Sequence, residues 1–134
     1  MTVLRRPRIL IVGDDPVHLG LYELLLQGGG FEGIPLEIRV SGLESMPEEG
    51  IDLVLLDAFV SPPTSILDVA QAAKRRYPNR PLLFLSDALG PRGDLGAYVT
   101  DQVGRRDAER LLRAVRLLLV ASGCIQDEGR AREG

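Results

Sequence analysis

Acidic and hydroxyl side chains follow directly on several short apolar runs of this 134-residue sequence. Asp14 and Asp57 each come just after such a run, and Ser86 comes after a third. If these runs are parallel strands, the three side chains gather at one carboxyl edge of a sheet. Two carboxylates ~5 Å apart repel by about 3 kcal/mol at an effective dielectric of ~20, so a divalent cation or a shared proton must stabilise them. A metal-bound aspartate beside a hydroxyl is a site that can accept a phosphoryl group.

The elements that must position these residues are visible as runs of hydrophobic residues. Continuous apolar runs predict strands that are buried on both faces, and an alternating run predicts a half-exposed edge strand. The continuous runs are Ile9–Val12, Ile51–Leu56, Leu82–Leu85 and the weaker Ala97–Thr100, and the alternating run is Leu36–Val40. With these limits, Thr100 and Asp101 stand at the carboxyl end of the last strand.

Helical patterns separate the runs. A helix is predicted over Pro16–Gln27 with Asp15 as its cap, and others over Ser65–Tyr77 and Asp107–Ala121. The apolar residues expected to form the face of the first helix are Val17, Leu21, Leu24 and Leu25. Alternation of strands and helices predicts an α/β domain with a parallel sheet and right-handed crossovers.

Length and composition indicate one domain, which we place at residues 1–121, followed by a polar and disordered tail over 122–134. No apolar run is long enough to span a bilayer, and no signal peptide is expected. The net charge of −3 does not favour nucleic-acid binding. A single cysteine, Cys124, is consistent with a reducing cytoplasmic compartment.

Other kinds of site are poorly supported by the sequence. No Gly-x-Gly-x-x-Gly follows the first strand, and neither a Gly-Lys-Ser/Thr motif nor a Cys/His metal pattern is present. A hydrolase of the haloacid-dehalogenase type would carry a second aspartate where Phe59 stands, so we expect no enzyme activity beyond phosphoryl acceptance at Asp57. His18 is expected to be a partly exposed helix residue.

Three segments, taken in order, resemble a response-regulator receiver domain of two-component signalling. Arg8–Pro16 is similar to the first strand and acidic loop of that family, Ile51–Asp57 to the strand that ends in the phosphoacceptor, and Tyr77–Ser86 to the lead into strand four. The resemblance covers about Arg8 to Val120. It implies a flavodoxin-like, doubly wound, five-stranded parallel sheet of order 2-1-3-4-5.

The resemblance also implies roles for individual residues. Asp57 would be the phosphorylated aspartate, and Ser86 and Tyr98 would be the switch residues that follow the phosphoryl group. Magnesium, or another divalent cation, would be held by Asp14, Asp57 and the backbone carbonyl of Phe59. An alternative register, which fits the strand less well, adds Asp15 to the metal ligands.

The sequence departs from the family pattern at four places. Gly13 stands where the first acid of the pair is expected, and Asp101 stands where the lysine of the last strand is expected. The second helix should be shortened, and glycines and a proline between Ser86 and Tyr98 should replace most of the fourth helix by a loop. An acidic edge with no ammonium group is therefore expected, although Arg92, Arg105 or Arg106 remain candidates for the absent charge.

We therefore expect a stand-alone, atypical receiver whose phosphorylation switch is weakened. Its partner would be a histidine kinase or a phosphotransfer protein, with no nucleic acid and no membrane. The alternative is a pseudo-receiver that binds a partner without phosphorylation. With the fourth helix reduced, Leu112 and Leu117 are expected to lose cover, so strand five and the last helix would form a surface for a homodimer or a partner protein.

Overall fold

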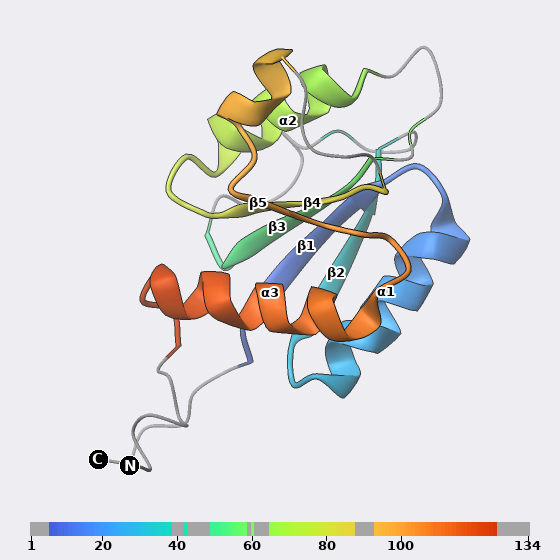
Figure 1. Cartoon of the computed structure of the whole chain (residues 1–134), viewed down its shortest axis with the longest axis vertical. Coiled ribbons are helices and arrows are strands. Elements are labelled where there is room, and N and C mark those ends of the chain that lie inside the picture. Colours follow the sequence, from blue (N-terminus) through green and yellow to red (C-terminus); the bar gives the residue numbers. More distant parts are fainter. Residues whose placement is uncertain are drawn as a thin grey trace.

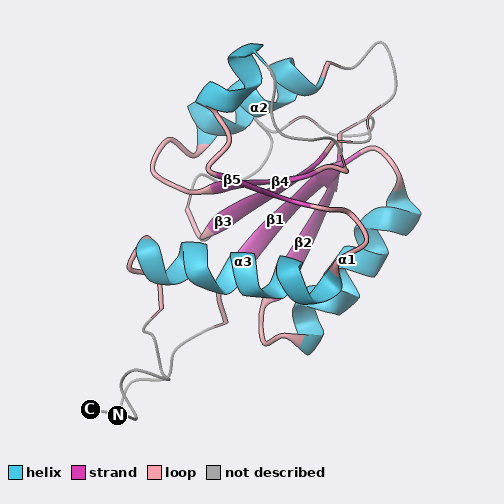
Figure 2. Cartoon of the chain, viewed as in Figure 1, coloured by secondary structure: helices cyan, strands magenta, loops and turns pink. Residues whose placement is uncertain are grey.

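The computed structural model describes residues 6–38, 42, 49–58, 60, 65–87 and 93–125. In chain order these residues form β1 (Arg8–Gly13), α1 (Pro16–Gly28), β2 (Glu32–Glu37), β3 (Leu53–Asp57), α2 (Ile66–Arg76), β4 (Leu82–Leu85), the 3-10 helix η2 (Gly93–Ala97), β5 (Asp101–Val103) and α3 (Ala108–Ala121). Figure 2 shows the strands at the centre of the molecule and the helices around them.

All five strands are parallel and follow the order β2-β1-β3-β4-β5, as expected for a doubly wound flavodoxin-like fold. Helices α1 and α3 cover one face of the sheet, and α2 with η2 covers the other (Figure 1). Val12 pairs with Leu56, and Asp57 pairs with Leu85, which pairs in turn with Val103. This register brings the carboxyl ends of the four strands β1, β3, β4 and β5 to one edge.

Alternating residues of the central strands build two separate cores. Ile9 and Ile11 of β1 belong to the core under α1 and α3, whereas Leu10 and Val12 belong to the core under α2. Leu53 and Leu55 of β3 follow the first pattern, and Asp57 continues it in sequence. Two-sided burial explains why these strands read as continuous apolar runs.

Each of the three α-helices begins directly after a capping residue. The carboxylate of Asp15 accepts from Val17 N at 3.0 Å, the hydroxyl of Ser65 from Asp68 N at 3.4 Å, and the carboxylate of Asp107 from Arg110 N at 3.1 Å. Such caps satisfy backbone donors that have no partner inside the helix. α1 begins at Pro16 as predicted, and α2 and α3 each begin one residue after the predicted start, which is the capping residue itself.

Two strands lie several residues away from their predicted positions. β2 runs over Glu32–Glu37 instead of Leu36–Val40, because an edge strand tolerates Pro35 where only one side needs pairing. β5 runs over Asp101–Val103 instead of Ala97–Thr100, because Tyr98 and Val99 pack against the core under α2 rather than joining the sheet. The shift of β5 changes which residues reach the carboxyl edge.

The buried face of α1 also differs from the prediction. Leu19, Tyr22 and Leu26 are buried, and of the predicted residues only Leu25 packs against the core; Val17, Leu21 and Leu24 are 67%, 58% and 66% exposed. Both sets recur at helical spacing, so periodicity alone does not choose between the two faces. We call Val17, Leu21 and Leu24 the apolar stripe of α1.

The shortened segments are described in part. Residues 39–41 and 43–48, where a clipped second helix was expected, lie outside the described residues. Between β4 and β5 the described helix is the five-residue η2, in agreement with the loss of most of a fourth helix; 88–92 lie outside the description. Ile125 packs on the core under α1 and α3, and residues 126–134 are not described, so the boundary at 121 stays a prediction. None of the described helices is long and apolar enough to cross a membrane.

Candidate functional site

Three buried polar residues stand at the carboxyl edge of adjacent strands. Asp14 follows β1 and is 4% exposed, Asp57 ends β3 and is 1% exposed, and Ser86 follows β4 and is 8% exposed. Gly13 lies against Asp57, since a Cβ on Gly13 would meet the Asp57 Cβ at 3.4 Å. The structure thus brings these sequence-predicted residues to one edge of the sheet.

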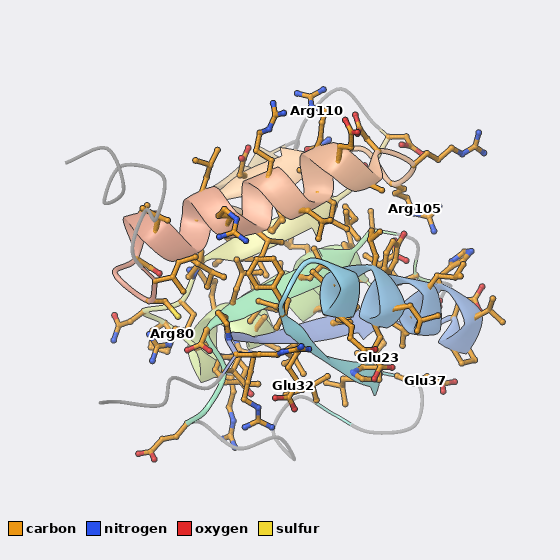
Figure 3. The ribbon with its side chains drawn as sticks, turned by 90° about the horizontal axis from the view of Figure 1, so that it is seen from below. Glu23, Glu32, Glu37, Arg80, Arg105 and Arg110 are labelled. Atoms are coloured by element: carbon orange, nitrogen blue, oxygen red, sulfur yellow. The ribbon has the colours of Figure 1, made fainter. Side chains whose placement is uncertain are left out.

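Arg105 supplies a positive charge to this edge. Its Nε donates to Oδ1 of Asp57 at 3.0 Å, and its Nη2 donates to Oδ2 at 3.4 Å. The side chain of Asp57 is 2% exposed and that of Arg105 is 22% exposed. Paired hydrogen bonds of this kind hold a carboxylate by geometry as well as charge. Figure 3 shows Arg105 between the start of α3 and helix α1.

Two residues of α1 contact the same guanidinium. Nη2 of Arg105 lies 3.0 Å from Nδ1 of His18, and Tyr22 lines the same cavity as Arg105 and interacts with its charge. Because arginine carries only donors, a hydrogen bond between these two nitrogens has Arg105 as the donor and Nδ1 of His18 as the acceptor. His18 Nδ1 also lies 3.4 Å from Oδ2 of Asp15 and 4.0 Å from Oδ2 of Asp57. The guanidinium is therefore held from both sides.

Charge and burial shift the pKa of two of these groups. Burial alone lowers the pKa of Arg105, but attraction and hydrogen bonding to Asp57 outweigh it, so the pKa is raised from its ordinary value. Burial raises the pKa of Tyr22, and the nearby charge of Asp57 raises it further, against a smaller opposing effect of Arg105. Both shifts follow from a carboxylate and a guanidinium enclosed together.

The backbone around Arg105 is fixed by the neighbouring strand. Arg105 N donates to Oδ1 of Asp87 at 2.9 Å, and a Cβ on Gly104 would meet the same oxygen at 3.4 Å. Arg105 lies two residues beyond Val103, the last residue of β5. The cation of the site thus comes from the loop between β5 and α3 rather than from a strand.

The expected replacement of the lysine by Asp101 is wrong in position. Asp101 opens β5, pairs with Leu83, is exposed and accepts a hydrogen bond from Gln102 N. Neither it nor Thr100 reaches the carboxyl edge, because β5 starts at Asp101, four residues later than expected. The prediction of an acidic edge without a balancing cation is wrong as well, since Arg105 fills that position.

Of the two predicted switch residues, Ser86 lies at the carboxyl edge and Tyr98 lies on the α2 side of the sheet. Ser86 is at the edge, where its backbone N–H donates to Val103 O at 2.9 Å. Tyr98 follows η2, and its hydroxyl accepts from Nε2 of Gln71 in α2 at 3.2 Å. Tyr98 is therefore packed on the α2 side and precedes β5 instead of lying in it.

Magnesium is the cation that the donor types would suit. Asp14 and Asp57 offer two buried carboxylates, and magnesium commonly takes one or two carboxylates and keeps several waters. Asp15, the alternative ligand, caps α1 and faces His18 instead. Phe59 lies outside the described residues. No group of three or more ligand-type side chains is present in the described part of the chain, so an ion at Asp14 and Asp57 would take its remaining ligands from water or backbone oxygens.

A cavity of about 410 Å³ adjoins the Arg105 side chain, between α1 and the start of α3. Its walls include His18, Tyr22, Leu21 and Arg106 besides Arg105 itself. The cavity thus begins at the guanidinium that pairs with Asp57 and continues to Leu21 of the apolar stripe of α1.

The sequence had only part of the information for this site. His18 and Tyr22 are four residues apart on one helix, and this spacing places them on one face. What identifies that face is the position of Arg105, which is 87 residues from His18 in the chain. Arg105 itself was one of three arginines considered, and no local pattern separated it from the other two.

Comparison with known sequences gives a short match. No family model matches the chain. A segment of 53 residues, 40% of the chain, is 38% identical to the sensor protein GacS of Pseudomonas syringae pv. syringae. The chain spans 6% of the length of that protein.

Comparison with solved structures covers nearly the whole fold. The chain is similar to a signal receiver domain of an HD-domain-containing protein from Pseudomonas fluorescens Pf-5, with 23% identity, a TM-score of 0.72 and coverage of 92% of this chain and 94% of the other. It is also similar to a chain in the complex of histidine kinase ThkA with response regulator TrrA, at 27% identity, TM-score 0.70 and coverage of 84% and 98%. TrrA of Thermotoga maritima with Mg²⁺ and BeF matches at 27% identity, TM-score 0.68 and coverage of 84% and 99%.

Proposed function

We propose that this chain, which has the fold of a response-regulator receiver domain, accepts a phosphoryl group on Asp57 in two-component signalling. The buried pair of Asp57 and Arg105 carries the proposal. A carboxylate oxygen attacks the phosphorus of a phosphodonor, the donor's phosphorus bond breaks, and the leaving group departs with that electron pair. The guanidinium offsets the negative charge that the phosphoryl oxygens bring.

Asp14 and Ser86 contribute in different ways to this proposal. Asp14 is the buried carboxylate that would hold magnesium together with Asp57, and the ion would offset charge on the transferring oxygens. Ser86 supplies a hydroxyl at the end of β4, next to β3. Asp57 is the group that is modified, so no further enzyme activity is part of the proposal.

The phosphodonor of the proposal is a histidine kinase or a phosphotransfer protein in the cytoplasm. Its support is the similarity to the complex of ThkA with TrrA, together with the apolar stripe of α1. The stripe begins at Val17, two residues after the cap Asp15, and it adjoins the cavity beside Arg105. An exposed apolar surface next to the reacting carboxylate favours a protein as the donor.

A second surface concerns self-association. Leu117 of α3 is 62% exposed, which supports a homodimer or a partner contact on the outer side of that helix. Leu112 does not belong to this surface, because it is partly buried and a Cβ on Gly29 would meet its Cδ2 at 2.7 Å.

The test is phosphorylation of the full chain by acetyl phosphate with Mg²⁺, followed by intact-mass analysis. The wild-type chain should gain the mass of one phosphoryl group, and Asp57→Asn should gain none. Asp101→Asn is the matched control, since Asp101 is exposed at the other end of its strand. Equal labelling of Asp57→Asn and wild type, or no labelling of either, contradicts the proposal.

The alternative function is a pseudo-receiver that binds its partner without phosphorylation. One observation favours it: the charge of Asp57 is already balanced within the protein by Arg105. Unlabelled wild type that still binds a sensor kinase, with binding lost in Leu21→Asp, would select this alternative.

A further inference from the structure

We propose that Arg105 blocks Asp57 by forming an ion pair with it. A divalent cation displaces the guanidinium from the carboxylate before the carboxylate reacts. The proposal concerns the same site as the proposed function and rests on it for the role of Asp57. It adds a competition between a side chain of the protein and a metal ion for one carboxylate. Arg105 is thus a positioning residue that decides when Asp57 is available.

Arg105 engages both carboxylate oxygens of Asp57. The two contacts are 3.0 Å from Nε to Oδ1 and 3.4 Å from Nη2 to Oδ2. Magnesium binds oxygen at about 2.0–2.1 Å and keeps a shell of waters. A hydrated ion and a guanidinium on the same carboxylate would also repel each other at short range. Occupancy by one therefore weakens binding of the other.

The Arg105 side chain has open space beside it. Its side chain is 22% exposed, and it borders the cavity of about 410 Å³ between α1 and α3. The backbone contact of Arg105 N with Asp87 does not involve the guanidinium, so the side chain can rotate while the loop stays in position. The exchange needs a change of rotamer and no rearrangement of the sheet.

Helix α1 stabilises the arrangement in which Arg105 is paired with Asp57. Nδ1 of His18 lies 3.0 Å from Nη2 of Arg105, and Tyr22 borders the same cavity as the guanidinium. Neither residue adds a carboxylate to the edge. Loss of the His18 contact should therefore favour the metal without changing the ligands that hold it.

The experiment is titration of the full chain with Mn²⁺, with free ion followed by electron paramagnetic resonance, in the absence of any phosphodonor. Arg105→Gln should bind Mn²⁺ at least ~10-fold more tightly than wild type, since a competing unit charge is removed. His18→Ala should bind with an intermediate affinity. Arg106→Gln is the matched control, because Arg106 lines the same cavity and is exposed, and its affinity should equal that of wild type.

The proposal is overturned if Arg105→Gln binds Mn²⁺ with wild-type or lower affinity, or if neither protein binds it. If Arg105→Gln does not fold, the wild-type chain decides the question. Saturating Mg²⁺ must then shift the nuclear magnetic resonance signals of Arg105 Nε–H and of the Tyr22 ring; bound Mg²⁺ with both signals unchanged overturns the proposal. Failure of the proposed function is separate, since it is measured by acetyl phosphate labelling at Asp57.

Discussion

Arg105 and Asp57 form a buried ion pair that joins residues 48 positions apart in the chain. The carboxylate is almost fully enclosed, whereas the guanidinium keeps partial contact with solvent. Removing one partner of such a pair leaves the other charge buried without a counter-charge. The resulting loss of folding stability is much larger than the net stability that the intact pair provides.

Arg105→Ala should lower the free energy of unfolding by about 2–4 kcal/mol in metal-free buffer, because Asp57 loses its counter-charge. The measurement is urea denaturation with a chelator present. Combining it with Asp57→Asn should cost less than the sum of the single changes, since the double variant leaves no charge unpaired. Arg106→Ala is the control, expected within ~0.5 kcal/mol of wild type; a loss for Arg105→Ala no larger than this would contradict the prediction.

Tyr22 should make the fold sensitive to alkali. Burial and the charge of Asp57 raise its pKa above 10.0, the value of the unfolded chain. The folded state then retains the phenolic proton longer than the unfolded state, so its contribution to stability is full below pH 10 and falls as pH rises through the raised pKa. Tyr22→Phe should show a weaker decline of unfolding free energy above pH 10. Identical pH profiles of the two proteins would rule out this effect.

Gly13→Asp should make stability depend on a divalent cation. The new Cβ would lie 3.4 Å from the Asp57 Cβ and 3.1 Å from Leu19 Cδ2, so a further carboxylate is added to the edge that already holds Asp14 and Asp57. Repulsion of about 3 kcal/mol at ~5 Å should destabilise the fold without metal, and millimolar Mg²⁺ should restore most of the loss. Thermal unfolding with and without Mg²⁺ measures this. Gly13→Ala separates packing from charge, and a Mg²⁺ effect of equal size in both variants would refute the charge explanation.

Gly33→Ala should destabilise the contact between β2 and α1. Its Cβ would approach Cα of Glu23 to 3.1 Å and Cδ1 of Ile11 to 2.9 Å, and backbone of a packed helix cannot yield cheaply. We expect a loss of about 1–3 kcal/mol in urea denaturation. Gly28→Ala, in the last turn of α1 with open space around it, should instead gain up to ~1 kcal/mol. Equal effects of the two changes would show that the contact is not tight.

The sequence could predict the parts of the fold that local chemistry specifies. β1, β3 and β4 are continuous apolar runs, and α2 and α3 have both a cap and a single strong apolar face, so their positions were confirmed. The face of α1 was predicted wrongly because Val17, Leu21 and Leu24 are apolar yet lie on its solvent side. A helix that carries apolar residues on two faces gives no local signal for which face is buried.

The candidate site also has a part that the sequence predicts and a part that it does not. Asp14, Asp57 and Ser86 stand directly after buried strands, so parallel pairing alone brings them to one edge. Arg105 reaches the edge through the path of a loop, which depends on where β5 starts and on its contact with Asp87. Misplacing β5 by a few residues was enough to put Asp101 there instead and to leave the edge without a cation.

Asp87 gives the β4 end a mechanical link to the ion pair. The Asp87 carboxylate, after β4, accepts a hydrogen bond from the backbone of Arg105, after β5. The Arg105 side chain in turn pairs with Asp57 at the end of β3. These two contacts connect the ends of three neighbouring strands of the sheet. A change in the position of Asp87 would therefore move the backbone that carries Arg105, and with it the counter-charge of Asp57.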